Sequence, residues 1–206
     1  MWPTVHAAIE FVLGLQRADG TIPWLPGSDI TLRAGCSSIH HAIRSASHLA
    51  HAVEDPRPSW SAAAGQLADA IRGPEKFLPK PHSMDWYYPV LGGVLDTTAL
   101  SRRWHEFVVA GLGVRCVDDQ PWVTGGETAE LALVLAVRGH LDQADQLLRD
   151  VERLRDTDGS YWTGYQYEND VLWPDERTTW TAGAVLLAHA ALAGEPATTA
   201  TFTPSA

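Results

Sequence analysis

Apolar residues recur at helical spacing along most of this 206-residue chain. In residues 3–16 the side chains of Val5, Ile9 and Leu13 fall on one face of a helix, and Pro3 suits its first turn. The same periodicity, together with serines placed to cap the first of them, predicts further helices. These helices are expected at residues 38–54, 58–72, 97–110, 126–138, 141–156 and 176–193.

Alternating patterns typical of strands are nearly missing from the sequence. One short hairpin is expected in "GSYWTGYQYENDVLW", residues 159–173, where aromatic residues alternate around a polar turn. The predicted fold class is therefore all-α, built from about seven helices paired as hairpins. We assign residues 1–194 to this domain and the Pro/Thr-rich residues 195–206 to a flexible tail.

Two segments of the sequence echo each other. "FVLGLQRADGTIPW" (residues 11–24) and "DVERLRDTDGSYW" (residues 150–162) each run from a helix through Asp-Gly to an aromatic residue. The glycine supplies the left-handed backbone conformation that ends a helix at low cost. The echo predicts stacked helical hairpins whose loops gather on one face of the fold.

Composition limits the classes of function. The chain is 45% hydrophobic, and its formal net charge of −10 argues against a nucleic acid or an anionic membrane surface as partner. No apolar run is long enough to span a membrane, and the N-terminus lacks the pattern of a signal peptide, so a cytoplasmic location is the default expectation. Cys36 and Cys116 are expected to be reduced thiols, and no metal or cofactor is predicted.

Tryptophan is unusually frequent, with nine residues, and many of them stand beside Gly, Pro or acidic residues. Core packing alone would place more of them inside helices. Those at or near predicted helix ends are Trp2, Trp24, Trp86, Trp122, Trp162 and Trp173. Such positions favour aromatic platforms on the loop face, where the C–H faces of sugar rings can stack.

The stretch "SMDWYYPVLGG", residues 83–93, places Asp85 before the aromatic residues Trp86, Tyr87 and Tyr88. We predict a bend on the loop face in which the acid and the three rings contact substrate. In the alternative interpretation, Asp85 caps a short helix or closes an Asx turn.

Glycoside cleavage needs two carboxylates, one as acid and one as base or nucleophile. "PWVTGGETAE" supplies a second candidate, Glu127, and we take Asp85 and Glu127 as the acid/base pair without assigning the two roles. Glu127 could instead form a capping box with Thr124 or compensate the helix dipole, and Glu130, one turn further along, is a weaker candidate.

Other side chains are expected to bind substrate or to line the cleft. For each aromatic residue, core or rim packing is the alternative. Glu176 could merely occupy the first turn of the last helix, and Arg177 is expected to form a salt bridge or to donate to a hydroxyl group. The candidates, besides the aromatic residues beside Asp85, are Arg115, Trp122, Trp162, Tyr165, Trp173, Glu176 and Arg177.

Two further clusters lack the context of a metal site. Asp118 and Asp119 stand side by side without the DDxxD pattern of enzymes that bind prenyl diphosphates through Mg²⁺, so we expect solvated acids. Four histidines fall in the predicted helix 38–54 without an HExxH motif, and a polar or partly buried helix face is expected there. They are His40, His41, His48 and His51.

Nearly the whole chain resembles an actinobacterial family usually labelled "prenyltransferase". The resemblance is carried by "WPTVHAAIEFVLGLQRADGTIPW", "SMDWYYPVLGG", "GLGVRCVDDQPWVTGGETAE" and "DGSYWTGYQYENDVLWPDERTTWTAG". The first run also resembles a helix and loop of (α/α)6-toroid, or six-hairpin, glycoside hydrolases. Its helix–Gln–x3–Gly–aromatic layout is similar to the repeat of the squalene cyclase and prenyltransferase toroids.

The resemblance implies a toroid and, through family members that hydrolyse methylmannose polysaccharide, an inverting glycosidase that acts on a carbohydrate such as an α-mannoside. A full toroid has twelve helices, more than are predicted here, and the chain resembles the C-terminal part of the family. Either N-terminal helices that complete the ring are missing, or another copy of the chain completes it by self-association.

Three functions remain open. A glycoside hydrolase is the leading interpretation. An isoprenoid enzyme of the prenyltransferase or terpene-cyclase type is the second, weakened because the DxDD motif of the cyclases is missing. A non-catalytic, truncated toroid that binds sugar or a partner chain is the third.

Overall fold

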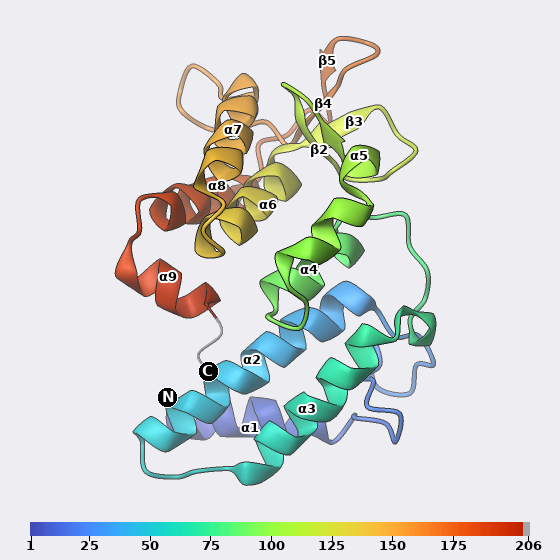
Figure 1. Ribbon diagram of the computed structural model, residues 1–206, viewed down its shortest axis with the longest axis vertical. Coiled ribbons are helices and arrows are strands. Elements are labelled where there is room, and N and C mark those ends of the chain that lie inside the picture. Colours follow the sequence, from blue (N-terminus) through green and yellow to red (C-terminus); the bar gives the residue numbers. More distant parts are fainter. Residues whose placement is uncertain (204–206) are drawn as a thin grey trace. The chain divides into compact units, whose positions relative to one another are not determined.

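The computed structural model describes residues 1–203, which are mostly helical (Figure 1). The chain forms two compact units. Unit 1 consists of Met1–Lys80 and Tyr88–Asp96, and unit 2 of Pro81–Tyr87 and Thr97–Ala206. The assignment of residues 1–194 to one toroidal domain stays a prediction.

Unit 1 is built on three helices, α1 (Trp2–Leu13), α2 (Arg33–Ala52) and α3 (Pro58–Arg72). A short 3-10 helix, η1 (Pro74–Lys76), follows α3. The apolar faces of the helices meet in one core, whose most deeply buried side chains are Ile43, Trp60, Leu67 and Ile71. The helices predicted at 3–16 and 58–72 are confirmed.

Helix α2 begins five residues before the predicted position. The serines expected to cap it lie inside the helix, where Ser37 Oγ and Ser38 Oγ donate to the carbonyl oxygens of Arg33 (2.8 Å) and Ala34 (3.3 Å). A serine hydroxyl inside a helix can donate to the carbonyl oxygen four residues earlier, so a serine does not by itself mark the first turn of a helix. The guanidinium of Arg33 instead fixes the start of α2 by donating to Ile71 O at the end of α3.

Unit 2 surrounds helix α6 (Gly125–Val137), which packs against α7 (Leu141–Val151) and α8 (Thr179–Leu192). Ten of the thirteen residues of α6 are buried, so this helix is the centre of the unit. A 3-10 helix, η3 (Glu152–Leu154), extends α7. The helices predicted at 126–138, 141–156 and 176–193 are confirmed, although α8 starts three residues late.

An antiparallel sheet corrects the all-α prediction. Its strands lie side by side in chain order, with Val114 opposite Thr124 and Val123 opposite Tyr165. The predicted hairpin is confirmed as β4 and β5, but the other strands are too short for a period of two to be recognised. The strands are β1 (Val108–Val109), β2 (Gly113–Arg115), β3 (Trp122–Thr124), β4 (Gly164–Gln166) and β5 (Val171–Leu172).

The helix predicted at 97–110 is broken. The 3-10 helix η2 (Thr97–Arg102) is followed by the single turn α5 (Trp104–Phe107), and the chain then enters β1. The helical spacing of the apolar residues continues to the valines of β1, but these β-branched residues pair across a turn whose Gly111 has a φ of 74°. Strand pairing therefore overrides the periodicity at this end.

The stretch "SMDWYYPVLGG" forms a helix, α4 (Met84–Leu91), and not the predicted bend. Pro89 lies inside this helix, and the boundary between the two units falls between Tyr87 and Tyr88. Helix α9 (Pro196–Phe202) occupies most of residues 195–206, which were expected to form a flexible tail. Residues 204–206 of that tail lie outside the described residues.

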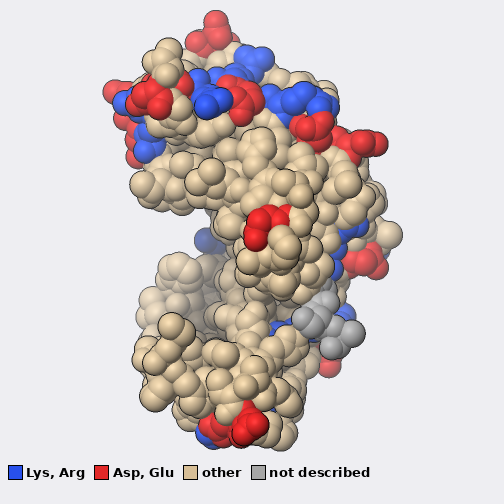
Figure 2. All heavy atoms as spheres, turned by 90° about the vertical axis from the view of Figure 1, so that its left-hand side faces the viewer, with Lys and Arg blue, Asp and Glu red and all other residues tan. Residues whose placement is uncertain are grey.

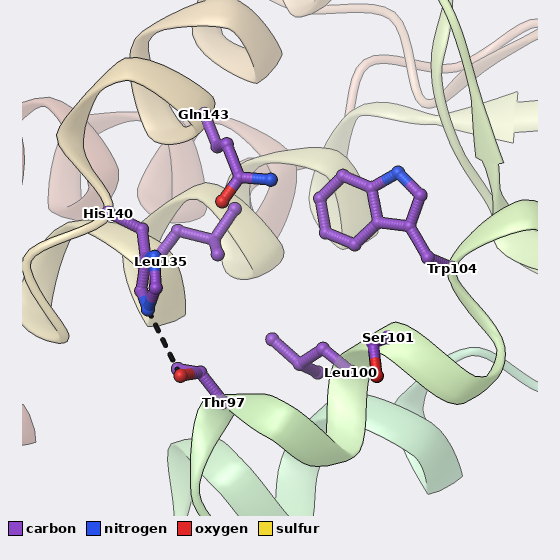
Figure 3. A pocket seen from close by; sticks show the side chains of 7 residues that line it. All are labelled: Thr97, Leu100, Ser101, Trp104, Leu135, His140 and Gln143. Atoms are coloured by element: carbon purple, nitrogen blue, oxygen red, sulfur yellow. Dashed lines mark hydrogen bonds between the residues drawn. The ribbon is translucent and has the colours of Figure 1, made fainter.

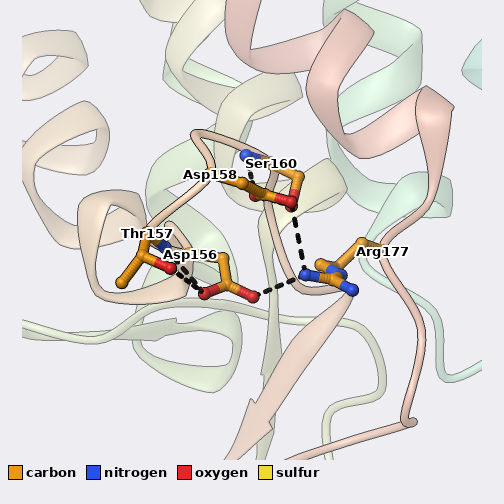
Figure 4. Close-up of polar contacts among 5 residues, drawn as sticks. All are labelled: Asp156, Thr157, Asp158, Ser160 and Arg177. Carbon is orange, nitrogen blue, oxygen red and sulfur yellow. Dashed lines mark hydrogen bonds and ion pairs between the residues drawn. The ribbon is translucent and has the colours of Figure 1, made fainter.

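The internal echo is visible as two matching turns. Asp19 Oδ1 accepts from Thr21 N and Oγ1 at 3.0 and 2.7 Å. In the second copy, Asp158 Oδ1 accepts from Ser160 N and Oγ at 2.9 and 2.5 Å (Figure 4). The glycines between these partners have φ angles of 86° and 88°, which confirms the left-handed turns. The gathering of the two loops on one face stays a prediction.

Each matching turn also has a basic neighbour. Hydrogen bonds from Thr21 lower the pKa of Asp19, and the charges of Lys76 and Arg17 act in the same direction. Hydrogen bonds from Ser160 lower the pKa of Asp158, and Arg177 adds to the effect.

None of the helices in the described part of the chain combines the length and the apolar character needed to cross a membrane.

Candidate functional site

The start of α6 holds Glu127, one of the predicted carboxylates, in a defined environment. Strand β3 runs directly into the helix, Thr124 is the N-cap residue, and Glu127 lies in the first turn. The Thr124 hydroxyl donates to Glu127 Oε2, and no side chain caps the backbone N–H groups. The capping box predicted as the structural alternative is therefore not formed in its usual geometry. The half-buried Glu127 carboxylate is held beside a helix N-terminus, where negative charge is favoured.

Cys116 is a second partner of this carboxylate. Burial, the negative charge of Glu127 and a hydrogen bond to it raise the pKa of the Cys116 thiol to about 12. The thiol therefore keeps its proton at neutral pH and donates to Glu127. Two neutral donors orient the carboxylate, and no ion pair of Glu127 is found among residues 1–203.

The first turn of α4 packs beside these residues. Ser83 N donates to Cys116 O at 3.0 Å, and the Tyr87 hydroxyl donates to Glu130 Oε2, one turn along α6 from Glu127. Asp85 is half-buried between Ser83 and Tyr87 in the same turn. The segment that carries Asp85 thus contacts Cys116, a partner of Glu127, and Glu130 on the same helix. The pairing of Asp85 with Glu127 stays a prediction.

The aromatic residues beside Asp85 do not form an open platform in this structure. Trp86 and Tyr87 are 5% and 0% exposed, and the indole of Trp86 stacks on Phe107 with ring centroids 5.2 Å apart. Consecutive residues of a helix point in different directions, so the α4 helix turns these rings into the core, while Tyr88 is half-buried. Burial speaks against a substrate platform at Trp86 and Tyr87, because a stacked sugar needs an open ring face.

Exposed aromatic surface lies instead on the sheet. Trp122 Nε1 donates to Trp173 O at 2.9 Å, and the two indoles meet edge to face at 5.1 Å. A Cβ at Gly164 would lie 2.7 Å from Val123 O and would also collide with the Trp122 indole, so the glycine admits this pair. Trp173 is 53% exposed, and Trp122 precedes Glu127 by only five residues.

Arg115 is bound by its neighbours within the sheet region. Its Nε and Nη2 donate to the Tyr167 hydroxyl at 3.0 and 2.7 Å, and Nη1 donates to Glu106 O at 2.8 Å. These bonds tie β2 to the residue that follows β4 and to α5, which precedes β1. They give Arg115 a structural role, and substrate binding by this residue stays a prediction.

Arg177 lies between two acids of the second matching turn (Figure 4). It approaches Asp156 at 2.6 Å and Asp158 at 3.6 Å, as the sequence led us to expect of a salt-bridge partner. Its guanidinium also lies 5.0 Å from the centroid of the Trp162 ring. Tyr165 has a separate partner, because its hydroxyl donates to Asp170 at 2.8 Å.

Glu176 is joined to the start of α6 through Thr163. Thr163 N donates to Glu176 O at 3.1 Å, Thr163 Oγ1 donates to Glu176 Oε1 at 3.3 Å, and Gly125 N donates to Thr163 O at 3.0 Å. Glu176 is exposed and lies before α8, whose N-cap is Thr178. It therefore stands outside the first helical turn and remains a third candidate acid.

Trp180, the last residue of the candidate run "DVLWPDERTTW", also lies beside this helix start. It lies in the first turn of α8 and is 67% exposed. A Cβ at Gly126 would lie 3.8 Å from its Cδ1 atom, so the indole edge covers the glycine next to Glu127. The glycine pair before Glu127 leaves room for this indole, since glycine has no side chain.

No cluster of three or more His, Cys, Asp and Glu side chains that could hold a metal ion is found among residues 1–203. Asp118 is paired with Arg103 at 2.7 Å, and Asp119 is exposed. In helix α2, His40 is buried and contacts Gly92 O through Nδ1 at 2.9 Å.

No known family model matches the chain. The chain is, however, similar to a protein whose name describes an endo-mannosidase. This relative is the MMP endo-(1,4)-3-O-methyl-alpha-D-mannosidase of Mycolicibacterium hassiacum, which is 48% identical over 202 residues. The aligned region covers 93% of this chain and 56% of the relative, so the chain spans little more than half of the relative's length.

Proposed function

We propose that this chain belongs to a glycoside hydrolase that cleaves an α-mannoside, and that Glu127 is one of its two catalytic carboxylates. The similarity to the endo-mannosidase carries this proposal, because it extends over 93% of the chain at 48% identity. The arrangement at the start of α6 supports the residue assignment. It combines an oriented carboxylate with exposed indoles at Trp173 and Trp180.

Asp85 is the proposed partner of Glu127. In an inverting reaction one carboxylic acid protonates the leaving oxygen while the other carboxylate activates a water molecule. This division requires about 6.5–9.5 Å between the carboxyl groups, whereas about 5–5.5 Å would indicate a retaining enzyme. Glu176 is the alternative partner, because Thr163 links it to the same helix start.

The proposed architecture is an (α/α) toroid of which this chain forms a part. The matching turns that follow α1 in unit 1 and α7 with η3 in unit 2 support a repeated helical unit. The sheet of unit 2 is then an elaboration of the loops between the helices of the repeat.

The test is an assay of the purified chain with α-(1,4)-linked 3-O-methylmannose oligosaccharides, with α-mannan and with prenyl diphosphates. We expect mannoside cleavage that falls by at least about 100-fold in Glu127→Gln, since general acid or base catalysis contributes this much. Glu168→Gln is the matched control, because Glu168 is exposed in the β4–β5 turn.

The other outcomes separate the alternatives. Loss of activity in Asp85→Asn supports the proposed pair, and loss in Glu176→Gln with an active Asp85→Asn assigns the second role to Glu176. Turnover of a prenyl diphosphate alone overturns the glycosidase proposal. Sugar binding without cleavage supports the non-catalytic alternative.

A further inference from the structure

A cavity of about 320 Å³ opens in unit 2 at the opposite end of α6 from Glu127 (Figure 3). Leu135, on its wall, follows Glu127 by eight residues, which corresponds to about 12 Å along the helix axis. The cavity is bounded by η2 and α5 on one side and by α6 and α7 on the other. Its volume lies at the lower end of the range for small-molecule sites.

The inner wall of the cavity is apolar and rigid. Leu100 and Leu135 are 3% and 2% exposed, so each is fixed by the core behind it. The half-buried indole of Trp104 forms the third part of this wall and packs edge to face against Trp86, with centroids 6.1 Å apart. Figure 3 shows Leu135 and Gln143 pointing toward this indole from the other side.

The rim of the cavity is polar and carries no carboxylate, lysine or arginine. Thr97 Oγ1 and His140 Nε2 are hydrogen-bonded at 3.0 Å and close one side. Ser101 Oγ donates to Thr98 O at 2.7 Å, which leaves its lone pairs as acceptors. The exposed amide of Gln143 offers both donors and an acceptor at the mouth.

We propose that this cavity is a second carbohydrate-binding site, which takes a neutral pyranoside carrying a methyl ether. A sugar ring presents a C–H face to the indole of Trp104 and hydroxyl groups to Gln143 and Ser101. The methyl group fits the apolar wall at Leu100 and Leu135, where a free hydroxyl would lack a hydrogen-bond partner. The choice of a mannoside rests on the proposed function, while the preference for a methylated, uncharged ring rests on the lining.

Such a site would hold one part of a polysaccharide while another part lies at Glu127. Binding that is equally strong in the ground state and the transition state lowers the KM for long chains and leaves kcat unchanged. The cavity therefore has a function that is separable from hydrolysis.

The test is a titration of the ¹⁵N-labelled chain with methyl 3-O-methyl-α-mannoside and, separately, with methyl α-mannoside. We expect the Trp104 indole N–H resonance to shift, and the methylated ligand to bind about fourfold tighter, the factor that burial of one CH₂-sized group gives. Gln143→Ala and Trp104→Ala should each weaken binding. Trp24→Ala is the matched control, since Trp24 is exposed in unit 1.

The removal of Gln143 tests the site without disturbing the fold, because its side chain is exposed. Binding that is unchanged in both cavity variants, no binding at all, or no preference for the methylated ligand overturns the proposal. Glu127→Gln separates it from hydrolysis: the variant should bind at Trp104 as the wild type does, even if neither protein cleaves mannosides.

Discussion

At the scale of single residues, the environment of each ionisable group is more informative than its identity. Two cysteines and nine histidines are unremarkable in the sequence, yet Cys116 and His40 are held in defined protonation states. Burial is the main cause in both cases, and a specific partner fixes the geometry. Protonation therefore offers direct tests of the local structure.

His40 should make unit 1 sensitive to mild acid. Burial lowers the pKa of the ring below its usual value of 6.5, and the charges of Arg44, His41 and Arg72 act in the same direction. The unfolded chain then binds the proton more readily, so stability is fully present above about pH 6.5 and falls as the pH drops below it. Urea unfolding between pH 7.5 and 5 should show this loss in the wild type.

His40→Asn keeps an amide donor for Gly92 O and removes the titration, so its stability should depend less on pH in that interval. His48→Asn is the control, because His48 is exposed on the same helix. Equal slopes for His40→Asn and the wild type would show that His40 does not carry the effect.

Cys116 should resist alkylation. Its thiol keeps its proton up to a pKa of about 12, and the thiolate is the reactive form. Iodoacetamide at pH 8 should leave Cys116 unmodified in the native protein and should modify it in urea, as measured by mass spectrometry. Glu127→Gln removes the neighbouring charge, so native alkylation at pH 9–10 should become faster in this variant. Equal rates in the native and unfolded wild type would refute the buried contact with Glu127.

At the scale of elements, long periodic helices were predictable and short elements were not. Helices α1, α3, α6 and α7 lie close to their predicted positions because apolar faces of three or four turns repeat the signal. Strands of two or three residues and the α4 helix, with Pro89 in its interior, offer no such repetition. The Asp-Gly turns were predictable because their conformation depends on local chemistry alone.

The candidate site follows the same rule. Glu127 could be singled out because it shares the short run "PWVTGGETAE" with Trp122, while its spacing from Thr124 predicted the structural alternative. Its contact with Cys116 could not be predicted, since it depends on the pairing of β2 with β3. The burial of Trp86 could not be predicted, because it depends on the helical conformation of residues 84–91, and the row of aromatic residues with Pro89 did not indicate a helix.

Gly92, which follows α4, lies so close to α2 that a side chain at this position should not fit. A Cβ at Gly92 would lie 2.5 Å from Ser37 O. The carbonyl oxygen of Gly92 itself is hydrogen-bonded to the ring of His40. Gly92→Ala should destabilise the protein by about 1–3 kcal/mol, the usual cost of overpacking. Gly65→Ala, in the open on α3, is the control and should be neutral or stabilising. A neutral Gly92→Ala in urea unfolding would contradict the close packing.

At the scale of the whole molecule, surface character bears on association. Figure 2 shows Lys, Arg, Asp and Glu side chains in separate groups on one face of the molecule, with uncharged surface between them. Helix α8 carries no Asp, Glu, Lys or Arg, and it exposes Trp180, Leu186 and Leu187 by 67%, 71% and 40%. Monomeric proteins seldom leave a continuous apolar face open to water.

The chain should therefore self-associate when it is studied alone. Sedimentation velocity is expected to show a mass that rises with concentration, and Leu186→Lys should shift the distribution toward the monomer. Thr199→Lys, which adds the same charge on α9, is the control. A concentration-independent monomer in the wild type would contradict a role for this surface in association.

The most direct measurement follows the anomeric configuration of the product by NMR during cleavage of an α-(1,4)-linked 3-O-methylmannose oligosaccharide. With the wild type, we predict that the β-anomer appears first, as inversion requires, and that Glu127→Gln forms product at least about 100-fold more slowly. Cleavage at the wild-type rate by Glu127→Gln, or no cleavage by the wild-type chain, would contradict the assignment of a catalytic carboxylate to the start of α6.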